Sequence, residues 1–225
     1  MTSANGLAPA PPKGALSDRI VDIIRRSILR GMMQPGEHLT QTGLAADYAI
    51  SKVPVREALK QLHAEGLLQH DRNRGYFVAK LSRSEATQLY KMRRWLEGEL
   101  LRSARWPTKP ELKQLKDYFN IISRPVNAAN RDEWHEALTH ARALMFGLSP
   151  ERTLLREAMR LWMLTDRFRS LMPDDASATG EKALYDALAR QDREALLAAH
   201  SADRDRIEHL LDDLFDMMPG YWAAD

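Results

Sequence analysis

The sequence predicts a mainly α-helical protein of two parts, in which three short helices and a β-hairpin precede an all-helical bundle. Three observations predict this fold. Apolar residues recur at helical spacing before residue 65 and again after residue 83. Strand-like segments are confined to residues 67–79. In the second part, dipeptides that end in proline separate the periodic segments.

The first helix is expected over Leu16–Arg30, where isoleucines recur at helical spacing with charged residues between them. Ser17 is its expected cap and Gly31 its expected end. The run Gln34-Pro35-Gly36 then turns the chain. Leu39, which follows this turn, is an expected core contact.

Two further helices are expected before the hairpin. The second is short, over Gly43–Tyr48, with Thr40 or Thr42 as its cap. Ser51 caps the third, whose first turn holds Pro54, where the missing N–H does little harm. Gly66 closes this helix, and its apolar face consists of Val55, Ala58, Leu59 and Leu62.

A two-stranded hairpin is expected after the third helix. Its strands are Leu67–Gln69 and Tyr76–Ala79, joined by a turn over His70–Gly75. Three helices followed by such a hairpin make a winged helix-turn-helix, with the hairpin as its wing. We assign residues 15–80 to this domain.

The rest of the chain, residues 81–225, is expected to form a bundle of six or seven helices, because no convincing strand pattern follows residue 83. The boundary is placed near residues 80–83, where strand periodicity stops. The predicted helices are Ser84–Arg105, Lys109–Ile122, Arg131–Gly147, Arg152–Leu171, Glu181–Arg190 and Arg193–Met218.

Composition narrows the classes of function. The chain has no cysteine, which excludes disulfides and thiolate metal sites. No apolar run approaches the ~20 residues of a membrane span, and residues 1–14 lack the pattern of a secretory signal. We expect residues 1–14 to be a disordered tail, the protein to be cytoplasmic, and the membrane not to be a partner.

Charge is distributed unevenly between the two parts. The chain has a net charge of +2, but residues 1–80 carry 11 Lys+Arg against 7 Asp+Glu, whereas residues 81–225 carry 22 against 24. A basic excess in a winged helix indicates contact with nucleic acid.

The start of the third helix carries the most informative pattern. Lys52 and Arg56 lie four residues apart and therefore project from one helix face. The planar fork of an arginine suits a guanine edge, and a helix N-terminus offers N–H groups to phosphates. Arginines in the wing turn suit the minor groove or the phosphates. The predicted contacts to double-stranded operator DNA are Thr40, Gln41, Thr42, Ser51, Lys52, Val53, Pro54, Arg56, Arg72, Asn73, Arg74 and Gly75.

These residues resemble the signature of the GntR family of bacterial transcription factors. The elements that match are Gly31, Pro35-Gly36, Leu44-Ala45, Ser51–Leu59, Glu65-Gly66-Leu67 and Gly75. Lys52 stands where the family more often has arginine, which keeps the charge and loses the fork. The resemblance implies a regulator that binds DNA.

The string Leu89–Leu101 resembles the first helix of the FadR-type C-terminal domain, the FCD subfamily, in which an arginine precedes a glutamate by four residues, here Arg93 and Glu97. The resemblance implies a helical effector-binding bundle, a small-molecule effector and a homodimer. On the residues alone, Arg93 and Glu97 are equally a simple i,i+4 ion pair.

Many FCD proteins hold a divalent metal with one aspartate and three histidines. Alignment places those positions at Leu138, Arg142, Glu181 and Asp203, which do not preserve the set. We therefore expect no cofactor and no ordinary FCD metal site. Instead, Arg142 is expected to pair with Glu181 and Asp203 across a pocket, or to bind a carboxylate effector with two hydrogen bonds.

Two alternatives stay open. His135 and His200, with Glu181 and Asp203, offer a displaced divalent metal site, as in a metal-sensing regulator or a metal-dependent hydrolase. An enzyme is not expected, because no nucleophile–base pair and no Gly-rich phosphate loop is present. A non-specific architectural DNA binder is the third class. Residues that would line an apolar pocket, or simply form core, are Trp134, Met145, Met159, Trp162 and Met163.

Overall fold

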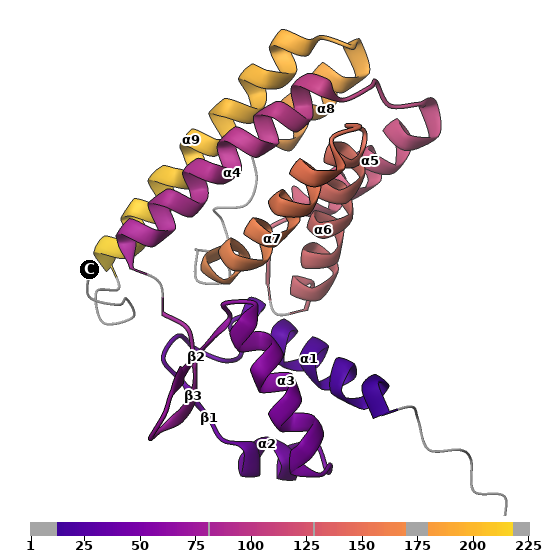
Figure 1. Cartoon of the computed structure of the whole chain (residues 1–225). Helices are drawn as coiled ribbons and strands as arrows, with labels where there is room; N and C mark the ends of the chain where they lie inside the picture. The colour runs from indigo at the N-terminus through magenta and orange to yellow at the C-terminus, as the bar shows by residue number, and fades with distance from the viewer. Residues whose placement is uncertain (1–12, 81, 128, 170–179, 218–225) are drawn as a thin grey trace, which may run out of the picture. The chain divides into compact units, whose positions relative to one another are not determined.

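The computed structural model describes residues 13–80, 82–127, 129–169 and 180–217 (Figure 1). The chain divides after Lys80 into two compact units, each with its own core. Among the described residues, no helix is long and apolar enough to span a membrane.

The first unit is a winged helix-turn-helix. Its elements are α1 (Lys13–Leu29), β1 (His38–Leu39), α2 (Gln41–Asp47), α3 (Lys52–Ala64), β2 (Leu68–Asp71) and β3 (Gly75–Val78). Helix α1 begins at Lys13, so the predicted tail over residues 1–14 is too long by two residues. The remainder of that tail lies outside the described residues.

The wing has a third strand that the sequence did not indicate. The antiparallel sheet has the order β1-β3-β2, with His38 paired to Phe77 and Leu39 to Tyr76. Strand β1 has only two residues, too few to show an alternating pattern. It ties the start of α2 to the wing, because α2 follows β1 after one residue, Thr40.

The core of the first unit lies between α1 and α3. Ile24 on α1 and Val55, Leu59 and Leu62 on α3 are fully buried, which is the apolar face predicted for the third helix. Each such side chain stabilises the fold by about 1.5–3 kcal/mol. Because this face of α3 is buried, its opposite face is presented to solvent.

The second unit is entirely helical in its described residues. Its helices are α4 (Arg83–Ser103), α5 (Lys109–Ile122), α6 (Arg131–Gly147), α7 (Arg152–Arg169), α8 (Glu181–Arg190) and α9 (Arg193–Met217). The bounds of α5, α6 and α8 agree with the predicted ones. The predicted ends at Leu171 and Met218, and the break at Met172-Pro173, lie outside the described residues.

Packing in this unit centres on two helices. Helix α4 lies beside α7 and α9, and α5 lies beside α6 and α8 (Figure 1). Caps fix the starts of α4 and α5, where the hydroxyls of Ser82 and Thr108 accept hydrogen bonds from Glu85 N and Glu111 N. The ion pair with Arg105 and hydrogen bonds from Thr108 lower the pKa of Glu111 to about 2.

Candidate functional site

The start of α3 is an exposed polar surface. Lys52, Val53 and Arg56 are exposed, and the Arg56 side chain keeps half of its surface accessible. Arg56 Nε donates to Glu57 Oε1 over 3.2 Å, a surface contact worth at most about 1 kcal/mol. The Ser51 hydroxyl makes no capping hydrogen bond, and Pro54 is half-buried. Because its ion pair with Glu57 is weak, the Arg56 guanidinium can reorient toward a ligand at a small cost in free energy.

A surface groove of about 370 Å³ joins this helix end to α2 and the wing. Six of the twelve predicted contact residues line it: Thr40, Gln41, Thr42, Lys52, Arg74 and Gly75. Two histidines that the sequence analysis did not select, His38 and His70, line it as well. Ser51, Val53, Pro54, Arg56, Arg72 and Asn73 do not line the groove.

The wing turn is held by Asp71. Its Oδ1 accepts hydrogen bonds from Asn73 N at 2.8 Å and from Arg74 N at 2.9 Å. These two bonds lower the pKa of Asp71 and keep it ionised. Gly75 has a φ of +93°, which residues with a Cβ rarely adopt. Arg72, Asn73 and Arg74 are all exposed on this turn.

Arg74 is positioned by an aromatic stack on the wing. Its guanidinium carbon lies 5.0 Å from the centre of the Phe77 ring. The His38 ring stacks on Phe77, with centroids 4.7 Å apart and planes inclined by 20°. Cation–π contacts at exposed sites contribute about 0.5–1 kcal/mol, enough to bias the orientation of an arginine.

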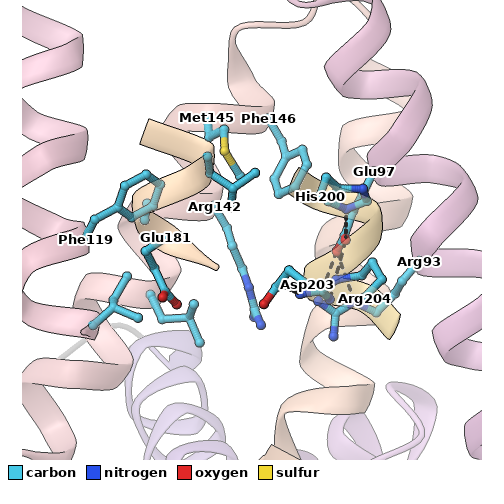
Figure 2. Close-up of a pocket in the computed structure, with 14 residues that line it drawn as sticks. Arg93, Glu97, Phe119, Arg142, Met145, Phe146, Glu181, His200, Asp203 and Arg204 are labelled. Atoms are coloured by element: carbon cyan, nitrogen blue, oxygen red, sulfur yellow. Dashed lines mark hydrogen bonds and ion pairs between the residues drawn. The ribbon is translucent and has the colours of Figure 1, made fainter. Parts of the chain in front are cut away.

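The second unit contains a small cavity of about 50 Å³ between its helices (Figure 2). In Figure 2, Arg93, Glu97, His200 and Arg204 gather on one side, Phe119 and Glu181 lie on the other, and Arg142 projects between them. Three of the seven predicted effector residues belong to this group of four, and Arg142, Glu181 and Asp203 complete the polar lining. In all, Arg93, Glu97, Arg142, Glu181, His200 and Asp203 line the cavity, whereas His135 does not.

Glu97 is the centre of a buried polar network. Its Oε1 accepts from Arg93 Nε at 3.1 Å and from Trp162 Nε1 at 2.6 Å, and its Oε2 lies 2.9 Å from His200 Nε2. Arg93 Nη1 also donates to Thr165 Oγ1 over 2.7 Å. Arg93 and Glu97 are 2% and 1% exposed, so their contact is a buried network rather than a surface ion pair.

The electrostatics of this network favour an ionised Glu97. Burial acts to raise its pKa, but the charges of Arg93 and Arg204 and the hydrogen bond with His200 outweigh burial and hold the pKa well below 4.5. Burial lowers the pKa of Arg93. For Arg204, the nearby carboxylates of Glu97 and Asp203 outweigh burial and raise the pKa.

Arg204 is only partly satisfied by this network. Its Nη2 donates to Asp203 Oδ2 over 2.5 Å, and its Nη1 lies 3.6 Å from Glu97 Oε2, beyond hydrogen-bond distance. Within the described part of the chain, Nε and Nη1 of Arg204 have no hydrogen-bond partner. A buried donor without an acceptor costs about 1–3 kcal/mol, more for a charged group. Arg204, 6% exposed, therefore keeps two buried donors without acceptors at the edge of the cavity that it lines.

The predicted pairing of Arg142 with Glu181 and Asp203 was wrong. Arg142 Nη1 donates to both carboxylate oxygens of Asp166 on α7, at 2.7 and 2.9 Å. Asp203 instead accepts from Arg204 and, over 2.8 Å, from Arg206 on its own helix. Neither Asp166 nor Arg204 was among the residues predicted from the sequence. The four-residue spacing of His200 and Arg204 on α9 was the available signal for Arg204.

The alternative metal site is not assembled. His135 is half-buried, and its ring packs edge-on against the Trp134 ring, 5.2 Å away. His200 is hydrogen-bonded to Glu97 through Nε2. No group of three His, Asp or Glu side chains in the described ranges is arranged to hold a metal ion.

The apolar candidates divide between cavity and core. Met145 lines the cavity, whereas Trp134 is core and donates to the Ile122 carbonyl over 2.8 Å. Trp162 joins the polar network through its indole N–H. Met159 is 50% exposed, so it belongs neither to the core nor to the cavity lining. Met163 is half-buried.

Comparisons with known proteins cover both units. Residues 16–78 match bacterial regulatory proteins of the gntR family, and residues 88–216 match the FCD domain. The transcriptional regulator YdhC of Bacillus subtilis is 34% identical over 74 residues, so the match spans 33% of each chain. The gluconate operon transcriptional repressor of the same organism is 24% identical over 90% of this chain and 88% of its own. The crystal structure of a GntR transcriptional regulator from Rhodococcus sp. RHA1 shares the fold, with a TM-score of 0.73 at 22% identity over 88% of this chain and 98% of the other.

Proposed function

Because the chain belongs to the FCD-domain members of the bacterial gntR family, we propose that it is a transcription regulator whose operator affinity is set by a small-molecule effector. One observation carries the DNA-binding role. The exposed start of α3, with Lys52 and Arg56, lies beside a groove that the wing residue Arg74 also lines. A helix end and a wing with cations on both match a major groove and its flanking phosphates.

The proposed contacts are to base edges, to the phosphate backbone and to the minor groove. Arg56 reads a base edge, and Lys52 binds a base or a phosphate. Thr40, Gln41, Thr42 and Ser51 contact the phosphate backbone, and the exposed methyls of Val53 pack on a thymine methyl group. Arg72, Asn73 and Arg74 lie along phosphates or in the minor groove, with Pro54 and Gly75 shaping the backbone that presents these contacts. As a two-fold dimer, the protein places its two α3 helices in successive major grooves of a palindrome.

Selection from random DNA tests this function. The full-length protein is expected to enrich an inverted repeat with half-site centres about 10 base pairs, or a multiple of that, apart. Sedimentation of the protein with the enriched duplex is expected to show two chains per operator. Recovery of DNA without any shared sequence would instead identify a non-specific architectural binder.

In the wing, the Phe77 ring is expected to contribute to DNA binding by orienting Arg74, because Phe77 itself carries no charge. If Phe77 acts by holding Arg74, Phe77→Leu is expected to weaken operator binding about two- to fivefold for each wing of the dimer. In an Arg74→Ala background the same substitution is expected to change nothing. Fluorescence titrations of the four proteins measure this coupling, and Phe77→Tyr, which keeps the ring, is the matched control. Equal effects of Phe77→Leu in both backgrounds would show that Phe77 acts independently of Arg74.

The cavity of the second unit is the proposed effector site, in which Arg142 and Arg204 bind an anionic group. We expect Arg142→Ala to weaken the effector response of the operator complex while operator affinity without effector is retained. Since that change leaves Asp166 without Arg142, the double variant Arg142→Ala/Asp166→Ala serves as the charge-balanced control. Operator release by the inducer is the readout. A normal response in both variants would show that Arg142 is not part of the effector site.

A further inference from the structure

The three histidines of residues 1–80 all lie on the wing sheet or against it. His38 is on β1 and His70 on β2, and both side chains are exposed. His63, on α3, places its ring 6.1 Å from that of His70. Histidine is the side chain whose charge changes between pH 5 and pH 8. The charge of the wing therefore depends on pH within this range.

Two of these histidines, His38 and His70, line the groove between the wing, α2 and the start of α3. Two cations, Lys52 and Arg74, line it as well, and none of the described residues that line it is acidic. A positive charge on either histidine would therefore add to a field that attracts anions. The phosphate backbone of DNA, with its regularly spaced charges, would contact several of these groups at once.

The ring of His38 is held at the wing turn. It stacks on Phe77, and the Arg74 guanidinium lies over the same Phe77 ring, 5.0 Å from its centre. The outer nitrogen of His38, Nε2, lies against the turn, since a Cβ at Gly75 would be 3.4 Å from it. His38 therefore presents a ring nitrogen at the turn that carries Arg74.

The charged groups around His38 are mainly cations. Arg74 in the wing turn and Lys52 on α3 line the same groove, and β2 brings the second histidine. Strand β3 brings the ring of Tyr76 and no charged side chain, and the residues of α2 that line the groove are uncharged. Glu37, the acidic neighbour of His38 in the chain, already accepts a backbone N–H on its Oε2 at 2.8 Å. A phosphate would therefore be the counter-ion of a protonated His38.

His70 has a carboxylate beside it in the chain. Its ring packs on that of Tyr76, with centroids 4.5 Å apart, and the His63 ring on α3 is the other titratable group against it. The neighbouring Asp71 lines a second groove, on which His70, Arg74 and Lys80 also lie. Because this carboxylate is a counter-ion for His70 within the protein, His38 is expected to respond more strongly to a phosphate.

We propose that His38 and His70 are further phosphate contacts of the DNA-binding surface, which engage the backbone when protonated, so that DNA affinity rises as pH falls through the range in which histidine gains its charge. The inference rests on the regulatory function proposed above, to which it adds a response to pH. By linkage, DNA favours the protonated histidines in turn, so binding takes up protons from solution.

Titrations of the full-length protein with the selected operator and with a scrambled duplex, at pH 8 and at pH 6, test this inference. Four such contacts in a dimer, each worth about twofold, give an affinity about tenfold or more higher at pH 6. The increase is expected for both duplexes, because both carry the same phosphates. Calorimetry in buffers of different ionisation enthalpy is expected to show proton uptake on binding near pH 7.

Variants assign the effect to these residues. The double variant His38→Gln/His70→Gln cannot gain the charges, and its ratio of affinities between pH 6 and pH 8 is expected to fall to about twofold or less. His38→Arg, which is charged at both pH values, is expected to bind more tightly than the wild type at pH 8 and to show a smaller ratio. His209→Gln, at an exposed histidine of α9, is the matched control and is expected to keep the wild-type ratio. Melting temperatures show whether each variant is folded.

The outcomes separate this inference from the function on which it rests. Equal affinities at the two pH values, or a wild-type ratio in a folded double variant, would overturn the role of the histidines and leave the regulatory function standing. A pH effect confined to the operator would assign the histidines to base edges and overturn the phosphate contact. Binding to neither duplex at either pH would overturn the regulatory function, and this inference with it.

Discussion

Arg56→Ala is expected to abolish specific operator binding while the protein stays folded. A guanidinium that makes two hydrogen bonds to a guanine contributes about 1–3 kcal/mol of base discrimination. In a two-fold dimer the substitution removes two such contacts, so the expected loss is about 2–6 kcal/mol. Specific and non-specific DNA binding differ by about 4–10 kcal/mol, so a loss of this size removes most of the preference.

The fold is expected to tolerate this change because of where Arg56 lies. Its side chain is half exposed and touches only the exposed Glu57 among the contacts described for it. Val55, Ala58 and Leu59, which hold α3 in the core, are untouched. Circular dichroism and the melting temperature are therefore expected to match those of the wild type.

Fluorescence anisotropy with the selected operator and a scrambled duplex measures the effect. Arg19→Ala, at an exposed arginine on α1, is the matched control and is expected to keep full preference for the operator. If Lys52 binds a phosphate, Lys52→Ala is expected to weaken binding to both duplexes alike. It is also expected to lower by about one the slope of the logarithm of affinity against the logarithm of salt concentration. Unchanged operator affinity in a folded Arg56→Ala protein would rule out a reading role for this residue.

The fold of the first unit could be predicted because local signals agree there. The apolar face of α3, the glycines that end helices and the alternation in β3 each specify the same arrangement. Strand β1 could not be predicted, because two residues carry no period and His38–Leu39 becomes a strand only by pairing with Phe77 and Tyr76. The stack of His38, Phe77 and Arg74 is a consequence of that pairing.

The helices of the second unit were predictable, but their polar contacts were not. Helical period and proline breaks locate the elements, whereas the partner of a buried charge depends on which helices pack together. Arg142 and Asp166 are 24 residues apart on α6 and α7. Glu97 and His200 are 103 residues apart, so only the packing of α4 against α9 joins them.

The buried network makes Glu97 the residue whose neutralisation is expected to cost most stability. Glu97→Gln keeps the shape of the side chain and removes the negative charge beside Arg93 and Arg204, which are 2% and 6% exposed. The amide also presents an N–H₂ group where Glu97 offered only acceptors to Trp162 and His200. Breaking a buried ion pair from one side costs about 3–5 kcal/mol, a large part of the 5–15 kcal/mol that typically holds a protein folded.

Urea denaturation followed by circular dichroism measures this loss, with Glu99→Gln as the matched control. Glu99 lies two residues further along α4, is 59% exposed and pairs with Arg102 on the surface, so its neutralisation is expected to cost less than about 1 kcal/mol. If the free energies of unfolding of the two variants differed by less than about 1 kcal/mol, the buried network would not contribute the stability expected of it.

The pH dependence of folding stability tests the contribution of the Glu97 charge independently. Because the pKa of Glu97 is lower in the folded protein than its ordinary value of 4.5, its ionisation stabilises the fold at neutral pH. That stabilisation is lost as pH falls below 4.5 toward the lower folded pKa, where the unfolded chain binds a proton that the folded protein does not. The stability of the wild type is therefore expected to approach that of Glu97→Gln over this range. A gap between the two proteins that stayed constant with pH would mean that Glu97 stabilises the fold by shape and packing, and not by its charge.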